Sequence, residues 1–206
     1  MKRKKRDILS NELKEKFYIQ LYFNLNYDYD KAAIKRAYRD FNRTLWIKDG
    51  NKEKRDELRE KAEDFLLKNL KELIIKNINS QEIFDIHHKE LCINFTEHWK
   101  ELTIGQSQKW INMTLKYWLL FGDTRIASIE KNAEFFHIPI DSYVLEGMFQ
   151  DKYPKLAWSK ITNYDDYFKY QIKHRESSPN TIPIIDEFSF FNEKDEVVNM
   201  NSKPIE

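Results

Sequence analysis

The residues whose types and spacing suggest chemistry lie in one central stretch of the chain. Its first segment, Leu102–Gly105, is too short for a helix, and its glycine predicts a tight hairpin turn. We expect the next helix to begin near Gln106 and to run to Phe121. A hairpin that leads directly into a helix presents free backbone N–H groups at the positive end of the helix dipole, where a phosphate group binds. Lys109, in the first turn of that helix, faces the same direction. The candidate phosphate contacts are Gly105, Gln106, Ser107, Gln108 and Lys116.

A second candidate side chain comes from Ile138–Val144, where a loop leads into a short helix. Asp141 follows Ile-Pro-Ile and has the type and position of a helix N-cap, whose carboxylate accepts hydrogen bonds from the first N–H groups of the helix. A plain N-cap and an exposed lysine in a first turn would explain Asp141 and Lys109 without any chemistry. The alternative is an amine and a carboxylate that act together, and both interpretations stay open.

The rest of the chain has the pattern of helices that must position these side chains. Apolar residues recur at helical spacing, while glycine and proline are scarce, with 4 and 5 in 206 residues. The sequence therefore predicts an all-α protein with seven or eight helices and no sheet beyond a stray hairpin. The expected helices include residues 11–24, 31–45, 52–76, 81–99, 106–121, 141–149 and 163–175.

We expect residues 1–175 to form a single helical domain around a hairpin-helix core at residues 102–149. Residues 176–206 should form an extended, partly disordered tail. Within it, Ile182–Phe191 is apolar enough to dock on the body as an extended segment, and Asp195–Glu206 is expected to be disordered. The tail has seven acids and two bases, whereas the first 175 residues have 33 bases and 27 acids. A mildly basic body with an acidic tail is compatible with nucleic-acid binding but does not require it.

Composition excludes several classes of protein. Cys92 is the single cysteine, which excludes an internal disulfide and a four-cysteine metal or iron–sulfur site. No apolar run reaches the ~18 residues of a membrane span. The basic start Met1–Arg6 is not followed by an apolar stretch, so we expect no secretory signal and a cytoplasmic protein of bacterial type. His87 and His88 are adjacent and lack the spacing of a helical zinc site, which predicts core or surface histidines. We expect neither a metal nor a cofactor.

Basic residues also gather on the second expected helix. Lys35, Arg36, Arg39 and Arg43 lie on its polar sides. A solvated helix face is the simpler interpretation, since basic residues on amphipathic helices are common. The functional alternative is a ridge that contacts phosphate groups.

The central stretch resembles the helix-hairpin-helix DNA glycosylase superfamily. In that family a Gly-apolar-Gly hairpin precedes a lysine in the next helix, and a downstream apolar-Asp step begins another helix. Here Gly105 matches the first hairpin glycine, whereas Ser107 stands in place of the second. Lys109 falls where the bifunctional members have their nucleophile, and Asn112 follows at the matching spacing. Asp141, in the sequence Ile-Asp-Ser-Tyr-Val, is similar to the apolar-Asp step, although the separation from Lys109 exceeds the usual one and would place an insertion at residues 123–137.

The resemblance implies a protein that binds double-stranded DNA and removes a damaged or modified base, as in base excision repair. Asp141 would stabilise the oxocarbenium-like transition state, and the amine of Lys109 would attack the sugar to form a Schiff base that leads to strand cleavage. The alternative is a non-catalytic helical factor, regulatory or defence-associated, that binds nucleic acid or protein. A shared, solvent-open cleft for Lys109 and Asp141 would favour catalysis. The sequence indicates no membrane partner, and it does not indicate the substrate base or the oligomeric state.

Overall fold

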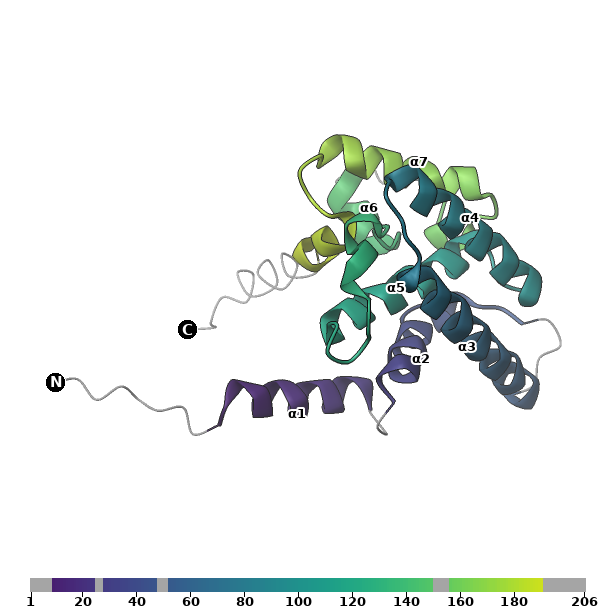
Figure 1. The fold of residues 1–206 in the computed structure, drawn as a ribbon. Helices are drawn as coiled ribbons and strands as arrows, with labels where there is room; N and C mark the ends of the chain where they lie inside the picture. The colour runs from purple at the N-terminus through teal and green to yellow at the C-terminus, as the bar shows by residue number, and fades with distance from the viewer. Residues whose placement is uncertain (1–8, 25–27, 48–51, 150–155, 191–206) are drawn as a thin grey trace, which may run out of the picture.

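The computed structural model describes residues 9–24, 28–47, 52–149 and 156–190. These residues contain helices and no strand, so the predicted all-α fold with seven or eight helices is confirmed. Short 3-10 helices connect several of the longer ones: η1 (Asn42–Thr44), η2 (Glu130–Phe135) and η4 (Trp158–Lys160). The longer helices (Figure 1) are α1 (Asn11–Phe23), α2 (Tyr29–Phe41), α3 (Lys52–Ile75), α4 (Gln81–His98), α5 (Ile104–Phe121), α6 (Ser142–Phe149) and α7 (Tyr164–Ser177).

Helix α5 is the centre of the fold. Every residue from Ile104 to Trp118 is buried, polar and charged ones included. Helices α4 and α7 pack on one side of α5 and α2 packs on another (Figure 1). Two indole N–H groups fix α2 against α5, because Trp110 donates to the Ile34 carbonyl (2.9 Å) and Trp118 donates to the Asp30 carbonyl (3.2 Å). A helix that is covered all round holds its side chains in fixed positions, whether they are apolar or polar.

The predicted hairpin turn at Gly105 is wrong. Helix α5 begins at Ile104, and Thr103 is its N-cap in a capping box: the Thr103 hydroxyl accepts from the Gln106 N–H, and the Gln106 side chain accepts from the Thr103 N–H. Gly105 therefore lies inside the first helical turn. Its glycine is explained by close packing, since a Cβ there would overlap the carbonyl oxygen of Trp158.

Several helix boundaries differ from the prediction, most at α2, which covers residues 29–41 rather than 31–45. Asp28 caps α2 by accepting from the Lys31 N–H (3.1 Å), so the helix begins two residues before the expected start at residue 31. Asn163 caps α7 by accepting from the Asp165 N–H (2.8 Å). In both cases a neighbouring residue of a capping type supplies the side-chain acceptor.

The segment after α7 also departs from the prediction. Residues 183–190 form a helix rather than an extended segment, and they dock on the body through buried Ile184 and Glu187. Pro183 begins this helix, a position where the missing N–H of proline costs nothing. The predicted disorder of Asp195–Glu206 and the basic start Met1–Arg6 lie outside the described residues.

Helix α1 extends away from the other helices at one edge of the molecule (Figure 1). Ile19 and Phe23 are buried, whereas Leu13, Phe17 and Leu21 are exposed by more than half. Among the described residues, no helix is both long and apolar enough to cross a lipid bilayer.

Candidate functional site: a Lys–Asp pair in a cleft

The structure brings the two predicted catalytic residues into direct contact. The Lys109 Nζ donates a hydrogen bond to Asp141 Oδ2, and the two groups form an ion pair across 32 residues of sequence. The Lys109 side chain is 3% exposed and that of Asp141 is 12% exposed. Both residues line one cleft, which is the arrangement that the catalytic interpretation requires.

Asp141 uses its two oxygens for two different tasks. Oδ2 accepts from Lys109, while Oδ1 accepts from the Val144 N–H (3.0 Å) at the start of α6. The predicted N-cap role is therefore present together with the ion pair. The cap fixes the carboxylate in position, and the second oxygen remains directed at the amine of Lys109.

Two glutamine side chains hold the segment that carries Asp141. Gln108 accepts from the Ile140 N–H (3.1 Å) and donates to the Ile140 carbonyl (2.7 Å). Gln171 of α7 makes the same pair of bonds to Ile138, at 3.2 and 2.8 Å. Each side-chain amide thus makes the two bonds that a neighbouring β-strand would make with that residue's N–H and carbonyl. Because Gln108 directly precedes Lys109, α5 positions both members of the ion pair.

The cleft has a volume of about 1360 Å³ and lies between α1, α2, α5, α6 and the helix at residues 183–190. Helix α5 supplies one wall with Lys109, Met113, Lys116 and Tyr117, which recur at helical spacing. The opposing walls are rich in aromatic and charged residues. Those that enter the argument below are Arg36, Arg39, Asp40, Arg43, Glu187, Phe188 and Phe190.

Lys116 is the second buried ammonium group of the cleft. Its Nζ pairs with the Glu187 carboxylate and lies 4.3 Å from the centre of the Phe188 ring. Burial and the neighbouring Lys109 ammonium lower the pKa of Lys116 to about 8. Glu187 is itself 5% exposed, so this pair is almost completely removed from solvent.

The α2 side of the cleft carries the arginines that the sequence identified as a basic face. Arg36 stacks over the Tyr22 ring at 4.0 Å and pairs with Asp40 at 3.6 Å. Burial raises the pKa of Asp40, and the Tyr117 hydroxyl donates to it at 2.6 Å. Arg39 and Arg43 are exposed and form no ion pair among the described residues.

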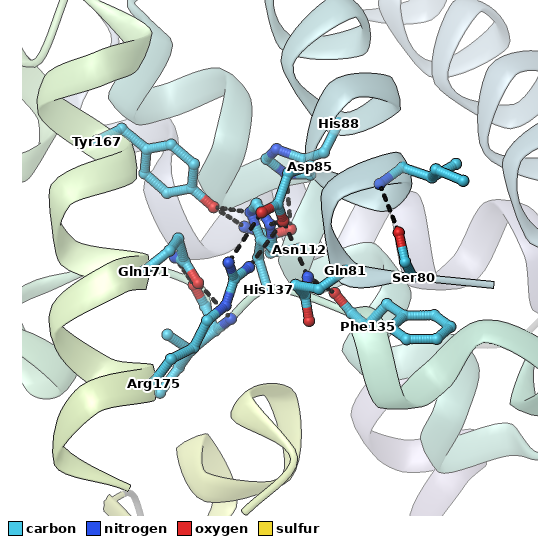
Figure 2. Close-up of polar contacts among 12 residues, drawn as sticks. Ser80, Gln81, Asp85, His88, Asn112, Phe135, His137, Tyr167, Gln171 and Arg175 are labelled. Carbon is cyan, nitrogen blue, oxygen red and sulfur yellow. Dashed lines mark hydrogen bonds and ion pairs between the residues drawn. The ribbon is translucent and has the colours of Figure 1, made fainter. Parts of the chain in front are cut away.

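A buried polar network adjoins the site and was not predicted from the sequence (Figure 2). Arg175 donates to both oxygens of Asp85 (2.9 and 2.8 Å), and Asp85 accepts from His137 Nε2 (2.7 Å). The Tyr167 hydroxyl donates to His137 Nδ1 (2.8 Å) and accepts from the Asn112 amide (3.0 Å). Burial keeps His137 neutral, so its Nε2 carries the proton that bonds to Asp85 and its Nδ1 accepts from the Tyr167 hydroxyl.

The same network includes His88, the predicted core histidine. Its Nε2 donates to Asn112 Oδ1 (3.0 Å), and its Nδ1 accepts from the Tyr164 hydroxyl (2.8 Å). Burial lowers the pKa of His88 well below its usual value and that of His137 to about 4, in spite of the nearby Asp85 carboxylate. None of these network residues lines the cleft. Their role is to fix α4, α5, α7 and the segment before Asp141.

The predicted phosphate contacts at the start of α5 are enclosed by the protein. The N–H groups of Gly105, Gln106 and Ser107 are bonded to the Ile161 carbonyl, the Thr103 hydroxyl and the Thr103 carbonyl. These three residues and Gln108 are buried and do not line the cleft. These three N–H groups are therefore not free to bind an anion in this conformation. Of the predicted contacts, Lys116 alone lines the cleft.

Glu187, Asp40 and Tyr117 complete the cleft without having been identified from the sequence. Their positions depend on contacts between elements far apart in the chain, and no local spacing indicates them.

No protein-family model, curated protein or solved structure matches this chain.

Proposed function

We propose that this protein is a DNA glycosylase-like enzyme that uses the Lys109–Asp141 pair to remove a damaged or modified base from double-stranded DNA. The observation that carries the proposal is the direct contact between this amine and this carboxylate inside a cleft. The cleft, at about 1360 Å³, exceeds the range of about 300–1,000 Å³ typical of small-ligand sites. It therefore has room for an extruded nucleotide together with its flanking phosphates.

The chemistry follows from the two groups. Lys109 loses a proton to solvent, which leaves Asp141 ionised, and the neutral nitrogen of Lys109 attacks C1′ of the deoxyribose. The N–C1′ bond to the lysine forms as the bond to the base breaks, and the base leaves with the electron pair and takes up a proton. Opening of the C1′–O4′ bond, with protonation of O4′, gives the Schiff base. Before attack is complete, the Asp141 carboxylate stabilises the positive charge that develops on the sugar.

The experiment is trapping of the covalent intermediate with borohydride on duplexes that contain damaged or modified bases. We expect a protein–DNA adduct with the wild-type chain and none with Lys109→Ala, while both variants bind DNA. Asp141→Asn should slow base release by about 10²–10³-fold, the usual loss when one placed electrostatic stabiliser is removed. Lys89→Ala is the matched control, because Lys89 pairs with Asp165 and does not line the cleft. An adduct that persists in Lys109→Ala would contradict the proposal.

A second candidate is a non-catalytic factor that binds nucleic acid. Arg39 and Arg43 favour it, since both line the cleft and neither has an ion-pair partner among the described residues. This candidate predicts DNA binding that weakens with salt, as each neutralised phosphate releases counterions, but no trapped adduct on any duplex. Arg39→Gln together with Arg43→Gln should then flatten the salt dependence. Binding that ignores salt would count against both candidates.

A further inference from the structure

We infer that Lys116 is a phosphate-binding subsite of the cleft and that the Glu187 carboxylate, carried on the chain's own helix at residues 183–190, occupies it as an internal competitor. The inference rests on the proposed function, because it assigns the phosphate to the DNA strand whose sugar contacts Lys109. It adds a second binding position to the cleft and a reason why the cleft must open.

The position of Lys116 supports a role beside Lys109. The two lysines are seven residues apart on α5, which is two helical turns, or about 10 Å along the helix axis. Both line the same cleft. A strand whose sugar lies at Lys109 would therefore bring an adjacent phosphate toward Lys116.

The nature of the present occupant identifies the ligand class. Glu187 is a buried carboxylate bonded to the Lys116 ammonium. Ammonium groups bind carboxylate and phosphate oxygens through the same charge-assisted hydrogen bonds. The aromatic ring of Phe188 covers the Lys116 ammonium, and Phe190 also lines the cleft. The helix therefore places an anion and two aromatic rings where a phosphate and bases of a strand would lie.

The attachment of this helix is suited to exchange. Of residues 183–190, only Pro183, Ile184 and Glu187 are buried, so a small set of side chains holds this part of the chain on the body. Removing Glu187 without replacement would take away the carboxylate that is bonded to the buried Lys116 ammonium beside Lys109, which is unfavourable. A phosphate that arrives as Glu187 leaves avoids this cost. The exchange of Glu187 for a phosphate is therefore nearly balanced in free energy. The docked helix reduces the apparent affinity for DNA to the intrinsic affinity multiplied by the fraction of molecules in which the cleft is open.

The first experiment measures binding of a short fluorescent duplex to full-length variants. Glu187→Gln should tighten binding by about tenfold, because the competing charge is lost and the open fraction rises. Asp186→Asn is the matched control: it removes the same charge one residue away, but Asp186 bonds to His174 (3.0 Å) and Thr181 (2.8 Å) and does not line the cleft. Equal effects of the two variants would overturn the inference, since net charge alone would then explain the change.

The subsite itself is tested by adding Lys116→Gln to Glu187→Gln. The double variant should bind more weakly than Glu187→Gln, and the slope of log affinity against log salt should fall by about 0.9, the contribution of one phosphate contact. An unchanged slope would show that no phosphate reaches Lys116. Circular dichroism of each variant checks that the helices are retained.

Hydrogen–deuterium exchange of the wild-type chain gives a readout that needs no substitution. Amides of residues 184–190 should exchange faster when duplex DNA is added, because the strand displaces the helix. Unchanged or slower exchange on saturation with DNA would overturn the inference while leaving the proposed function standing. Failure of the wild-type chain and Glu187→Gln to bind any duplex at low salt would instead remove the proposed function, and the inference with it.

Discussion

At the scale of single residues, the site depends on pairing of polar groups that have little access to water. Lys109, Asp141, Lys116 and Glu187 are all at most 9% exposed as whole residues. A buried charge persists only with a partner, so these four residues form two mutually dependent pairs. The geometry of the Lys109–Asp141 pair is set by neighbours that carry no charge, of which Gln108 is the most direct.

Replacement of Gln108 tests this positioning role. Gln108→Leu keeps the approximate volume but leaves the Ile140 N–H and carbonyl without partners, which should cost about 1–3 kcal/mol for each unsatisfied group. Gln171→Leu is the matched control, because Gln171 makes the same two bonds to Ile138 and is equally buried. We expect losses of the same order in urea unfolding, with the larger loss for Gln108→Leu, because Gln108 also accepts from the Asn112 amide (3.1 Å).

The two variants should differ in activity. Ile140 directly precedes Asp141, so Gln108→Leu should reduce trapped adduct per folded molecule much more than Gln171→Leu does. Equal trapping by the two variants would show that Gln108 supports the fold alone and does not position the carboxylate.

At the scale of elements, the start of α5 shows where local sequence and tertiary contact give different answers. Gly105→Ala should favour the helix by up to about 1 kcal/mol on intrinsic propensity alone. However, the new Cβ would overlap the Trp158 carbonyl oxygen and lie 2.9 Å from the carbonyl carbon. Because backbone has little freedom to move, we expect a net loss of about 1–3 kcal/mol in thermal or urea unfolding.

Gly147→Ala in α6 is the comparison for this prediction. Its Cβ would meet the ring of Phe190, which is a side chain and can turn away. The loss of stability should therefore be smaller than for Gly105→Ala. A stabilised Gly105→Ala protein would mean that α5 and η4 are less closely packed than the structure indicates.

These glycines also explain how far the sequence could predict the elements. Helical periodicity and capping residues located the helices, since both are local properties. The periodicity did not reveal that Gly105 lies within α5, because the sequence does not distinguish a glycine needed for close packing from a glycine needed for a turn. The contact of Gln108 with Ile140 and that of Lys116 with Glu187 join residues 32 and 71 positions apart, and no local pattern encodes them. Lys109 and Asp141 were identified through a resemblance to a family, not through their spacing.

At the scale of the whole molecule, the network in Figure 2 joins three helices and the segment before Asp141. It holds a part-buried bidentate Arg175–Asp85 pair and two fully buried histidines. Burial alone would raise the pKa of Asp85, but hydrogen bonds from His137 and Arg175 outweigh this and hold it well below its usual value. Protonation of Asp85, His88 or His137 is therefore linked to the free energy of unfolding.

This coupling predicts a loss of stability in mild acid. The pKa of His137 is lowered from 6.5 in the unfolded chain to about 4 in the folded protein. Between these values the unfolded state binds a proton that the folded state does not, so the free energy of unfolding falls as pH decreases from 6.5 to 4. The loss is on the order of 3 kcal/mol for this residue, and His88, whose pKa is also lowered, acts in the same direction. The groups that face His137 are Asp85, Tyr167, His88 and Arg175.

Urea unfolding across this pH range provides the measurement. His137→Asn should be less stable than the wild-type chain at pH 7, because it disturbs the bonds to Asp85 and Tyr167, but its stability should depend less on pH between 6.5 and 4. His87→Asn is the matched control, since His87 is partly exposed on α4 and lies outside the network. Below about pH 3.8, the usual pKa of an aspartate, the unfolded chain also binds a proton at Asp85. The folded protein does not, because the pKa of Asp85 is lower in the folded state, so the free energy of unfolding falls further. A wild-type stability that stays constant or rises as pH falls from 6.5 to 4 would contradict the neutral, buried state of both histidines.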